Sequence, residues 1–218
     1  MVEKIAVYGA GGFARETAWL VQSCNEESKQ YEVVCFADDN GALYGTIING
    51  IPVTSIEDAF FQYPGAKIVT AVGVPKTRQI LVDKAASVGF GFATIIHPRV
   101  ERSGWIDIGL GTVICAGNIL TVNIALGQHV QINLDCTIGH DVKMDDFTTL
   151  APGVHVSGWV HFGKRVYVGT GAVIINGSKE NPLFIGDDAV IGAAGCVTKS
   201  VPANTTVVGV PAKALVRG

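Results

Sequence analysis

Residues 108–174 read, in groups of six, IGLGTV ICAGNI LTVNIA LGQHVQ INLDCT IGHDVK MDDFTT LAPGVH VSGWVH FGKRVY VGTGAV I. The first residue of every group (a hexad) is large and apolar, and the fifth is often small or β-branched. A period of six cannot be helical, because 3.6 residues per turn would rotate every sixth side chain off one face. The pattern instead predicts short strands that each point one large side chain inward before the chain turns a corner.

Stacked hexads predict a repeating all-β architecture for the second half of the chain. Three hexads would close one triangular turn, and successive turns would share a continuous apolar core. The period is interrupted at residues 176–182 and resumes at Ile185, Ile191 and Val197. We interpret the interruption as a loop that projects from one corner. About fifteen hexads would give about five turns of a parallel β-helix over residues 98–218.

Residues 1–97 follow a different pattern, in which short apolar strands alternate with helices. Strands are expected at residues 4–8, 31–37, 67–72 and 92–96, and helices at residues 14–23 and 77–87. This order predicts an α/β unit of Rossmann-like form, with a small parallel sheet covered by helices. A Gly-rich turn at residues 9–12 follows the first strand.

The composition restricts the classes of function. The formal net charge is −3, so no basic surface is expected for nucleic acid or anionic lipid. No run approaches the roughly 18 apolar residues of a membrane-spanning helix, and the first residues do not resemble a signal peptide. The five cysteines are widely spaced and form no Cys-x-x-Cys pair, which argues against a disulfide framework or a zinc site. We expect a cytoplasmic protein with reduced thiols, no metal, and no nucleic-acid or membrane partner.

Three motifs, in this order along the chain, resemble one known family. They are GAGGFARE at residues 9–16, Asn133 followed by Gly139-His140-Asp141, and VGVPAK at residues 208–213. Over nearly its full length the chain is similar to the NeuD/PglD-like sugar acetyltransferases, a branch of the hexapeptide-repeat acyltransferases. The resemblance implies a left-handed β-helix, acetyl-CoA as co-substrate, a homotrimer with its site between subunits, and a role in bacterial surface-glycan synthesis, such as that of lipopolysaccharide or O-antigen.

The resemblance gives His140 the role of general base. A neutral imidazole suits proton removal near pH 7, and Asp141 would orient the ring; Asn133 belongs to the same catalytic motif. The plain alternative is a histidine exposed at a corner of the β-helix. Many relatives carry a second histidine nine residues after the base, where this chain has Thr149, whose hydroxyl could still donate a hydrogen bond to the thioester.

The resemblance also places coenzyme A in a groove between adjacent β-helices. The implied contacts are Thr149, Gly158, Gly192, Ala193, Val210, Pro211 and Lys213, with Lys213 near the phosphates. Small residues would let the pantetheine arm approach the backbone. The corners of a β-helix require glycines in any case, so these residues have a structural explanation as well.

The Gly-rich turn matches the dinucleotide-binding fingerprint Gly9-x-Gly11-x-x-Ala14, with Asp38 at the end of the second strand. A dehydrogenase is therefore an alternative, although 97 residues are few for a full dinucleotide domain and no second catalytic domain follows. In the resembling family this turn holds the nucleotide of a sugar-nucleotide substrate. The implied contacts are Gly11, Gly12, Phe13, Arg15, Asp38, Asp39 and Gly73.

These features together predict an N-acetyltransferase. It would move an acetyl group from acetyl-CoA to the amino group of a nucleotide-linked amino-deoxy sugar by direct attack, without an acyl-enzyme. The nearest alternative is O-acetylation of a sugar hydroxyl, such as that of a sialic acid. Two further alternatives are a non-catalytic β-helix scaffold and a carbonic-anhydrase-like metal protein that would use His129, His155 and His161.

Overall fold

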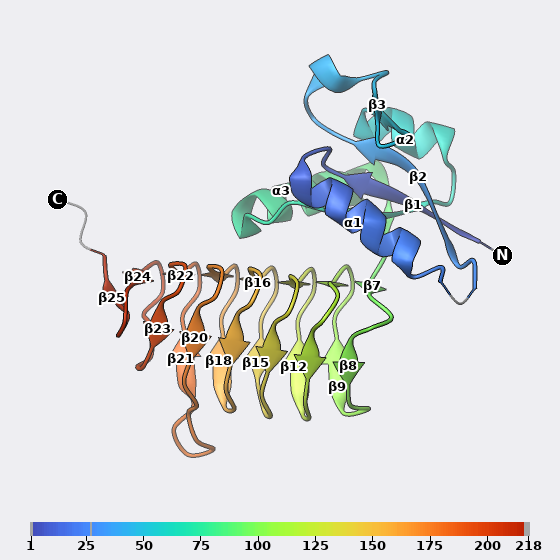
Figure 1. The fold of residues 1–218 in the computed structure, drawn as a ribbon. Coiled ribbons are helices and arrows are strands. Elements are labelled where there is room, and N and C mark those ends of the chain that lie inside the picture. The colour runs from blue at the N-terminus through green and yellow to red at the C-terminus, as the bar shows by residue number, and fades with distance from the viewer. Residues whose placement is uncertain (1, 27, 216–218) are drawn as a thin grey trace. The chain divides into compact units, whose positions relative to one another are not determined.

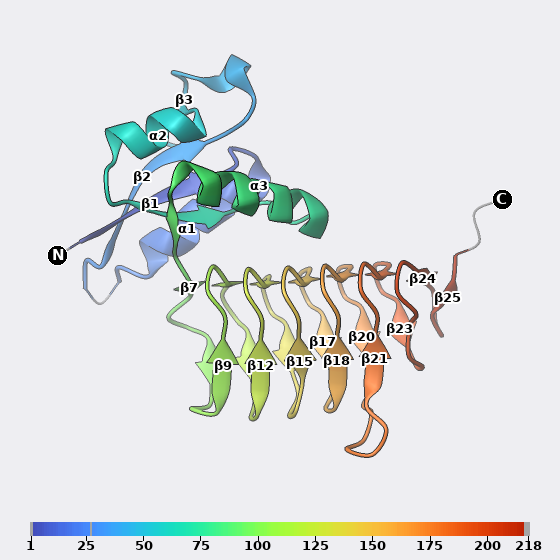
Figure 2. The ribbon, with the colours of Figure 1, turned by 180° about the vertical axis from the view of Figure 1, so that it is seen from behind.

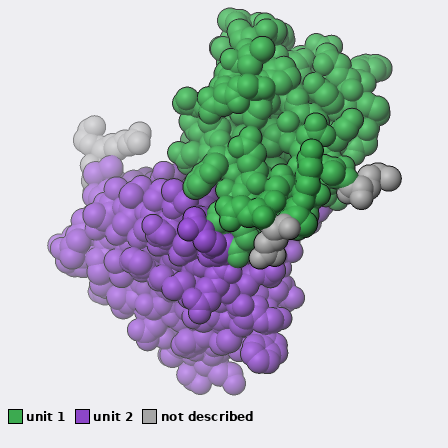
Figure 3. All heavy atoms as spheres, turned by 45° about the vertical axis from the view of Figure 1, so that its right-hand side comes forward, with its two compact units in different colours: residues 1–98 green, residues 99–218 purple. Residues whose placement is uncertain are grey.

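In the computed structural model the chain divides into two compact units, residues 1–98 and 99–218, coloured separately in Figure 3. The structure describes residues 2–26 and 28–215. Each unit is described by itself below.

The first unit is a mostly parallel sheet flanked by helices. Its elements are β1 (Glu3–Tyr8), α1 (Gly12–Ser23), β2 (Tyr31–Ala37), the 3-10 helix η1 (Gly41–Leu43), β3 (Ile47–Ile48), β4 (Ile51–Thr54), α2 (Ile56–Gln62), β5 (Lys67–Thr70), α3 (Pro75–Val88), β6 (Gly91–Phe92) and β7 (Ile95–Ile96). The sheet order is β3-β4-β2-β1-β5-β6, with only β3 antiparallel to its neighbour. Figures 1 and 2 show α1 on one face of this sheet and α2 and α3 on the other.

The local sequence explains these elements. The apolar run from Ile5 to Tyr8 is buried, as expected for a central parallel strand covered by helices on both faces. Helix α3 begins at Pro75 and ends before Gly89, which has the left-handed φ of 109° that glycine tolerates best. The two expected helices and the strands expected at residues 4–8, 31–37 and 67–72 are present, but the single strand expected at residues 92–96 is wrong, because it is two separate strands, β6 and β7, of which only β6 joins this sheet. Strands β3 and β4 and helix α2 were missed, because elements of two, four and seven residues are too short to show a readable period.

The second unit is a left-handed β-helix built from three sheets of very short strands (Figures 1 and 2). Sheet 1 contains β10 (Val113–Ile114), β13 (Gln131–Ile132), β16 (Thr149–Leu150), β19 (Tyr167–Val168), β22 (Val190–Ile191), β24 (Thr206–Val208) and the antiparallel β25 (Lys213–Ala214). Sheet 2 contains β8 (Glu101–Arg102), β11 (Ile119–Leu120), β14 (Thr137–Ile138), β17 (His155–Val156), β20 (Val173–Ile174) and β23 (Cys196–Val197). Sheet 3 contains β9 (Ile106–Ile108), β12 (Ile124–Leu126), β15 (Lys143–Met144), β18 (Val160–Phe162) and β21 (Leu183–Ile185).

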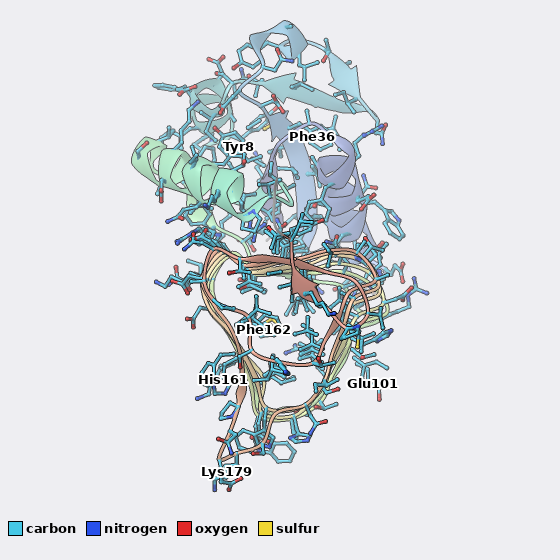
Figure 4. The ribbon with its side chains drawn as sticks, turned by 90° about the vertical axis from the view of Figure 1, so that its left-hand side faces the viewer. Tyr8, Phe36, Glu101, His161, Phe162 and Lys179 are labelled. Atoms are coloured by element: carbon cyan, nitrogen blue, oxygen red, sulfur yellow. The ribbon has the colours of Figure 1, made fainter. Side chains whose placement is uncertain are left out.

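The strand register confirms three hexads per turn. Paired residues are 18 positions apart, as Ile138 is from Val156 and Met144 from Phe162. Figure 4 looks along the β-helix and shows a triangular cross-section, with Phe162 pointing inward and His161 outward. The first residue of every hexad from 114 to 174 is buried. The fifth residue of every hexad from Thr112 to Ala172 is buried too. The core is therefore continuous along the β-helix.

Most corners of the β-helix between residues 111 and 204 are made by a residue with a left-handed backbone conformation. This residue is the fourth of its hexad, and the last such hexad starts at Val201, which pairs with Ile185. Where the residue is not glycine its φ lies between 54° and 62°, at Asn123, His129, Asp135, Asp141, Phe147, Trp159, Arg165, Asp188, Ala194 and Asn204. Asparagine, aspartate and glycine tolerate this conformation at least cost. The corner geometry therefore explains why short polar residues and glycine recur at the fourth position.

The interruption at residues 176–182 is a projecting loop, as expected (Figure 1). Across it, Phe162 pairs with Ile185, a separation of 23 instead of 18, so the loop inserts five residues into one turn. Sheet 2 has six strands, one more than the five turns expected, because backbone pairing continues into β8, where no large apolar residue marks a hexad. No helix within residues 2–26 and 28–215 is long and apolar enough to cross a membrane.

Candidate active site

His140 lies at the corner between sheets 2 and 3, between β14 and β15. Its side chain is 54% exposed, and its Nδ1 lies 2.8 Å from Oδ2 of Asp141. A carboxylate held at Nδ1 fixes the tautomer and orientation of the ring and leaves Nε2 to face a substrate. The structure therefore gives His140 and Asp141 the geometry of a base and its orienting group.

The imidazole of His140 rests against Gly158 of the next turn. A Cβ atom at Gly158 would lie 2.5 Å from Cε1 and 2.6 Å from Nε2 of His140. The indole of Trp159 meets the same imidazole edge-on, with 6.4 Å between ring centroids. Gly158, expected from the resemblance to contact coenzyme A, thus has a role that the sequence did not show, since its missing side chain makes room for the imidazole.

Asn133 lies at a different corner, after β13, between sheets 1 and 2. It is buried; its Nδ2 donates to the carbonyl of Leu150 at 3.1 Å, and its own carbonyl accepts from Asn118 at 2.8 Å. These bonds tie neighbouring turns together. Within one chain the structure gives Asn133 this role and does not bring it beside His140.

The residues expected to bind coenzyme A occupy four places, one of which is that of Gly158 beside His140. Val210, Pro211 and Lys213 are exposed, and their segment is tied to β23 by bonds from Cys196 N to Gly209 O at 3.0 Å and from Ala212 N to Cys196 O at 2.7 Å. Strand β23 is three strands from β14 in sheet 2, about 14 Å at ~4.8 Å per strand. A long flexible arm that begins at His140 would therefore reach this segment along sheet 2.

The other expected coenzyme A residues lie elsewhere. Gly192 and Ala193 follow β22 at the corner between sheets 1 and 2, and a Cβ atom at Gly192 would come 2.7 Å from Cγ1 of Val208, so the β-helix itself requires this glycine. Thr149 lies in β16 of sheet 1 and is 1% exposed. A single chain therefore does not bring the Thr149 hydroxyl to His140.

The residues expected to bind the nucleotide meet at one edge of the α/β sheet. Gly11, Asp38 and Gly73 follow the carboxyl ends of β1, β2 and β5, which are neighbours with β1 in the centre. The chain leaves β1 for β2 on one side and later takes up β5 on the other, which makes this edge a topological switch point, the usual ligand site of open α/β sheets. A Cβ atom at Gly11 or Gly73 would meet nothing within 4 Å.

Helix α1 points its N-terminus at the same edge. Gly11 is its N-cap and carries no capping side chain, while Gly12 and Phe13 form its first turn and Arg15 lies exposed in the next. Nε of Arg15 lies 3.4 Å from the carbonyl of Gly11. Backbone amides at such a helix start bind phosphate well.

The two acidic residues after β2 are already bonded within the chain. Asp38 accepts from the amide of Ala10 through Oδ2 and from the amide of Asn40 through Oδ1, both at 2.8 Å. It therefore fixes the Gly-rich turn. Asp39 accepts from the hydroxyl of Tyr8 at 2.8 Å and pairs with Nζ of Lys84 at 2.7 Å.

The pKa shifts follow from these contacts. Burial and the hydrogen bond to Asp39 raise the pKa of Tyr8. Partial burial works to raise the pKa of Asp39, but the hydrogen bonds from Lys84 and Tyr8 outweigh it and hold the pKa below its usual range. Asp39 is therefore ionised at neutral pH.

The sequence did not reveal the importance of Tyr8, Arg78 or Lys84. The guanidinium of Arg78 is buried, and its Nη1 donates to the carbonyls of Val72 at 3.0 Å and Gly73 at 3.3 Å. Arg78 thus holds the loop after β5. The available signal was a charged residue on the buried face of α3, which is uncommon unless the residue is paired.

No cluster of three or more His, Cys, Asp or Glu side chains that could hold a metal is present in the described part of the chain. The remaining histidines of the β-helix are apart from one another. His129 stacks on Phe147, His155 bonds the hydroxyl of Thr137 at 2.8 Å, and His161 packs edge-on against Phe184.

Comparisons with known proteins find relatives that cover nearly the whole chain. Residues 4–85 match the family model described as the PglD N-terminal domain. Over 214 residues the chain is 34% identical to the GDP-perosamine N-acetyltransferase of Escherichia coli O157:H7, which covers 97% of this chain and 96% of that protein.

Two solved structures share the whole fold. WeeI from Acinetobacter baumannii AYE superimposes with a TM-score of 0.88 at 36% identity, covering 98% of this chain and 100% of that one. PerB from Caulobacter crescentus, in complex with CoA and GDP-perosamine, gives a TM-score of 0.84 at 26% identity, covering 99% of this chain and 98% of that one. The chain therefore belongs to the PglD-like sugar acetyltransferases of the hexapeptide-repeat acyltransferase superfamily.

Proposed function

We propose that the protein transfers the acetyl group of acetyl-CoA to the amino group of a nucleotide-linked amino-deoxy sugar, with GDP-perosamine as the first acceptor to test. The observation that carries the proposal is the similarity, over almost the full length of both chains, to the GDP-perosamine N-acetyltransferase of Escherichia coli O157:H7. PerB, which shares the fold, was solved with CoA and GDP-perosamine together.

In the proposed reaction the amine nitrogen of the sugar attacks the thioester carbonyl, and Nε2 of His140 takes a proton from that nitrogen. The tetrahedral intermediate collapses, the carbon–sulfur bond breaks, and the proton passes from His140 to the departing thiolate, which gives the acetamido sugar and free CoA. Asp141 stabilises the imidazolium through Nδ1–H.

Direct transfer is favoured over an acyl-enzyme. Burial raises the pKa of Cys35 to about 12 and of Cys136 to about 11. A thiol needs a low pKa and access to the substrate to act as a nucleophile, and these two have neither. These two thiols are therefore unsuited to form an acyl-enzyme, and in the proposal the attacking group is the amine of the substrate itself.

The nucleotide would bind at the carboxyl edge of β1, β2 and β5. The amides of Gly12 and Phe13 at the start of α1 would face the diphosphate, and the exposed Arg15 would pair with it. Asp39, which follows β2 at the same edge of the sheet, would lie at the margin of the same site, while Asp38 would act through the turn that it fixes.

Coenzyme A would run from His140 along sheet 2 toward Val210, Pro211 and Lys213. A hollow of about 500 Å³ opens beside the loop at residues 176–182, on the same corner of the β-helix as Gly158, and offers room for part of the coenzyme. We propose that a homotrimer completes the groove, with Gly192 and Ala193 facing it across subunits, while the buried Asn133 and Thr149 support it from within their own chain. We also propose that the enzyme serves surface-glycan synthesis in the cytoplasm.

The test is an assay of free thiol release from acetyl-CoA with a panel of GDP-, UDP- and dTDP-linked 4-amino-4,6-dideoxy sugars. We expect turnover with GDP-perosamine or another single member, and a decrease in kcat of about 10²- to 10⁴-fold for His140→Ala. If no member of the panel caused thiol release while CoA still bound, the proposal of an amine acceptor would be wrong and a sugar hydroxyl would be favoured. Full activity of His140→Ala would overturn its role as base.

A further inference from the structure

Asn123 lies at the corner one turn before Asp141, 18 residues earlier and at the same position of its hexad. Its Nδ2 donates a hydrogen bond to Oδ1 of Asp141 at 3.3 Å. The other oxygen of that carboxylate, Oδ2, lies 2.8 Å from Nδ1 of His140. The three side chains form a connected series, amide to carboxylate to imidazole, that uses both oxygens of Asp141.

The backbone holds these corners in register. The amide of Asp141 donates to the carbonyl of Val122, and the amide of Trp159 donates to the carbonyl of His140, both at 3.1 Å. Asn123 and Asp141 have nearly the same left-handed φ, 56° and 58°. Their side chains therefore leave equivalent points of consecutive turns, which is why a residue as short as asparagine reaches the carboxylate.

The second contact matters because a carboxylate turns easily. The Cβ–Cγ torsion of aspartate has a broad energy minimum, and the Asp141 side chain is 24% exposed, so one hydrogen bond to His140 leaves it free to rotate. A donor on Oδ1 restricts that rotation and keeps Oδ2 on Nδ1. Proton removal at Nε2 requires this arrangement, since it requires the hydrogen of neutral His140 to be on Nδ1.

We propose that Asn123 is a positioning residue of the acetyl-transfer reaction, which acts on His140 through Asp141 and does not itself touch the substrate. The inference rests on the proposed function, in which His140 is the base. Asn123 is not part of the sequence motif around His140, because it lies 18 residues before Asp141. It comes next to Asp141 only because consecutive turns of the β-helix stack in register.

Asn123→Gly tests the proposal, since glycine keeps the left-handed corner and removes the side chain that carries the amide group. We expect kcat to fall about 3- to 10-fold, the usual effect of one net hydrogen bond, while the KM for acetyl-CoA stays within about twofold. Asn204→Gly is the matched control, because Asn204 occupies the same hexad position with a φ of 57° in the last turn. Its kcat should be unchanged.

A double-mutant cycle separates a positioning role from a purely structural one. In an Asp141→Asn background the effect of Asn123→Gly on kcat should disappear, because the carboxylate through which Asn123 acts is gone. An equal decrease in both backgrounds would overturn the proposal. If Asn123→Gly fails to fold, Asn123→Asp, which keeps the shape and replaces the donor by an acceptor, takes its place and should lower kcat at least as much.

Nitrogen-15 NMR of labelled histidine gives a readout that needs no substrate. We expect the neutral form of His140 to carry its hydrogen on Nδ1 in the wild type and in Asn204→Gly, and to become a mixture of tautomers in Asn123→Gly. If the tautomer of His140 in Asn123→Gly were the same as in the wild type, the proposal would be wrong. Because this measurement does not depend on acetyl transfer, its result stays separate from a failure of the proposed function.

Discussion

The two units assemble their site residues by different routes. In the β-helix, Asn123, Asp141 and Trp159 are 18 residues apart and meet because successive turns stack in register. In the α/β unit, Gly11, Asp38 and Gly73 follow three neighbouring strands whose order in the sheet differs from their order in the chain.

The two units should therefore respond differently to a substitution. In a repeat architecture each turn contacts only its neighbours, so a substitution at one corner acts on the same corner of the next turn. In the α/β unit the contacts at the site are made by long-range pairs such as Tyr8–Asp39 and Lys84–Asp39. Four substitution experiments test this difference.

The largest effect is expected from core cavities, where the two units should behave alike. Ile138 in the β-helix and Ile68 in the α/β sheet are both buried, and truncation of a buried isoleucine to alanine costs about 2–5 kcal/mol. We expect losses in this range for Ile138→Ala and Ile68→Ala in urea-induced unfolding. Ile80→Ala, at a position 65% exposed, is the control and should stay within about 0.5 kcal/mol of the wild type. A loss below about 1 kcal/mol for Ile138→Ala would contradict a close-packed β-helix core.

The next effect concerns transmission between turns. In Gly158→Ala the new methyl group would overlap the imidazole of His140, and because that ring is the end of a flexible side chain it will move and leave the rest of the structure intact. We expect kcat to fall at least about tenfold, the equivalent of 1.4 kcal/mol, with little change in thermal unfolding. Gly104→Ala, where a Cβ atom meets nothing within 4 Å, should leave both unchanged. Equal kcat values for the two variants would show that Gly158 does not seat the base.

The third experiment tests the corner conformation by itself. Asn204 has a φ of 57°, which costs a β-branched residue about 1–2 kcal/mol. Asn204→Val should therefore lower the free energy of unfolding by about that amount, while Asn204→Gly should be nearly neutral. The measurement is thermal unfolding of both variants, and a neutral Asn204→Val would argue that the corners do not select residues by backbone conformation.

The smallest effect is expected for the ion pair of the α/β unit. Lys84 and Asp39 are partly exposed, so Lys84→Met should cost less than about 1 kcal/mol at pH 7. The pKa of Asp39 is lowered in the folded state, so its contribution is complete above the unfolded pKa of about 3.9 and is lost as pH falls through the folded pKa. The difference between variant and wild type should shrink from pH 7 to pH 3 in urea unfolding. Lys179→Met, in the loop of the β-helix, should show no such pH dependence.

The sequence alone predicted the architecture of the β-helix, its loop, the parallel α/β unit and the pairing of His140 with Asp141. The hexad period is local and recurs many times, so it survives the loss of any single position, and neighbours in sequence at a corner are neighbours in space. The Gly-rich turn was likewise readable, because it directly joins a strand to a helix.

The residues that share a corner could be identified only in the folded structure. Asn133 and His140 are seven residues apart and look like one motif, yet they lie at different corners, because one hexad spans one side of the triangle. Asn123 and Gly158, 17 residues before and 18 residues after His140, instead join it because three hexads return the chain to the same corner. The fingerprint predicted that Asp38 binds a ligand, but its carboxylate accepts hydrogen bonds from backbone amides of its own unit. Such contacts depend on closure of the β-helix and on strand order in the sheet. Neither of these can be predicted from a short segment of the sequence.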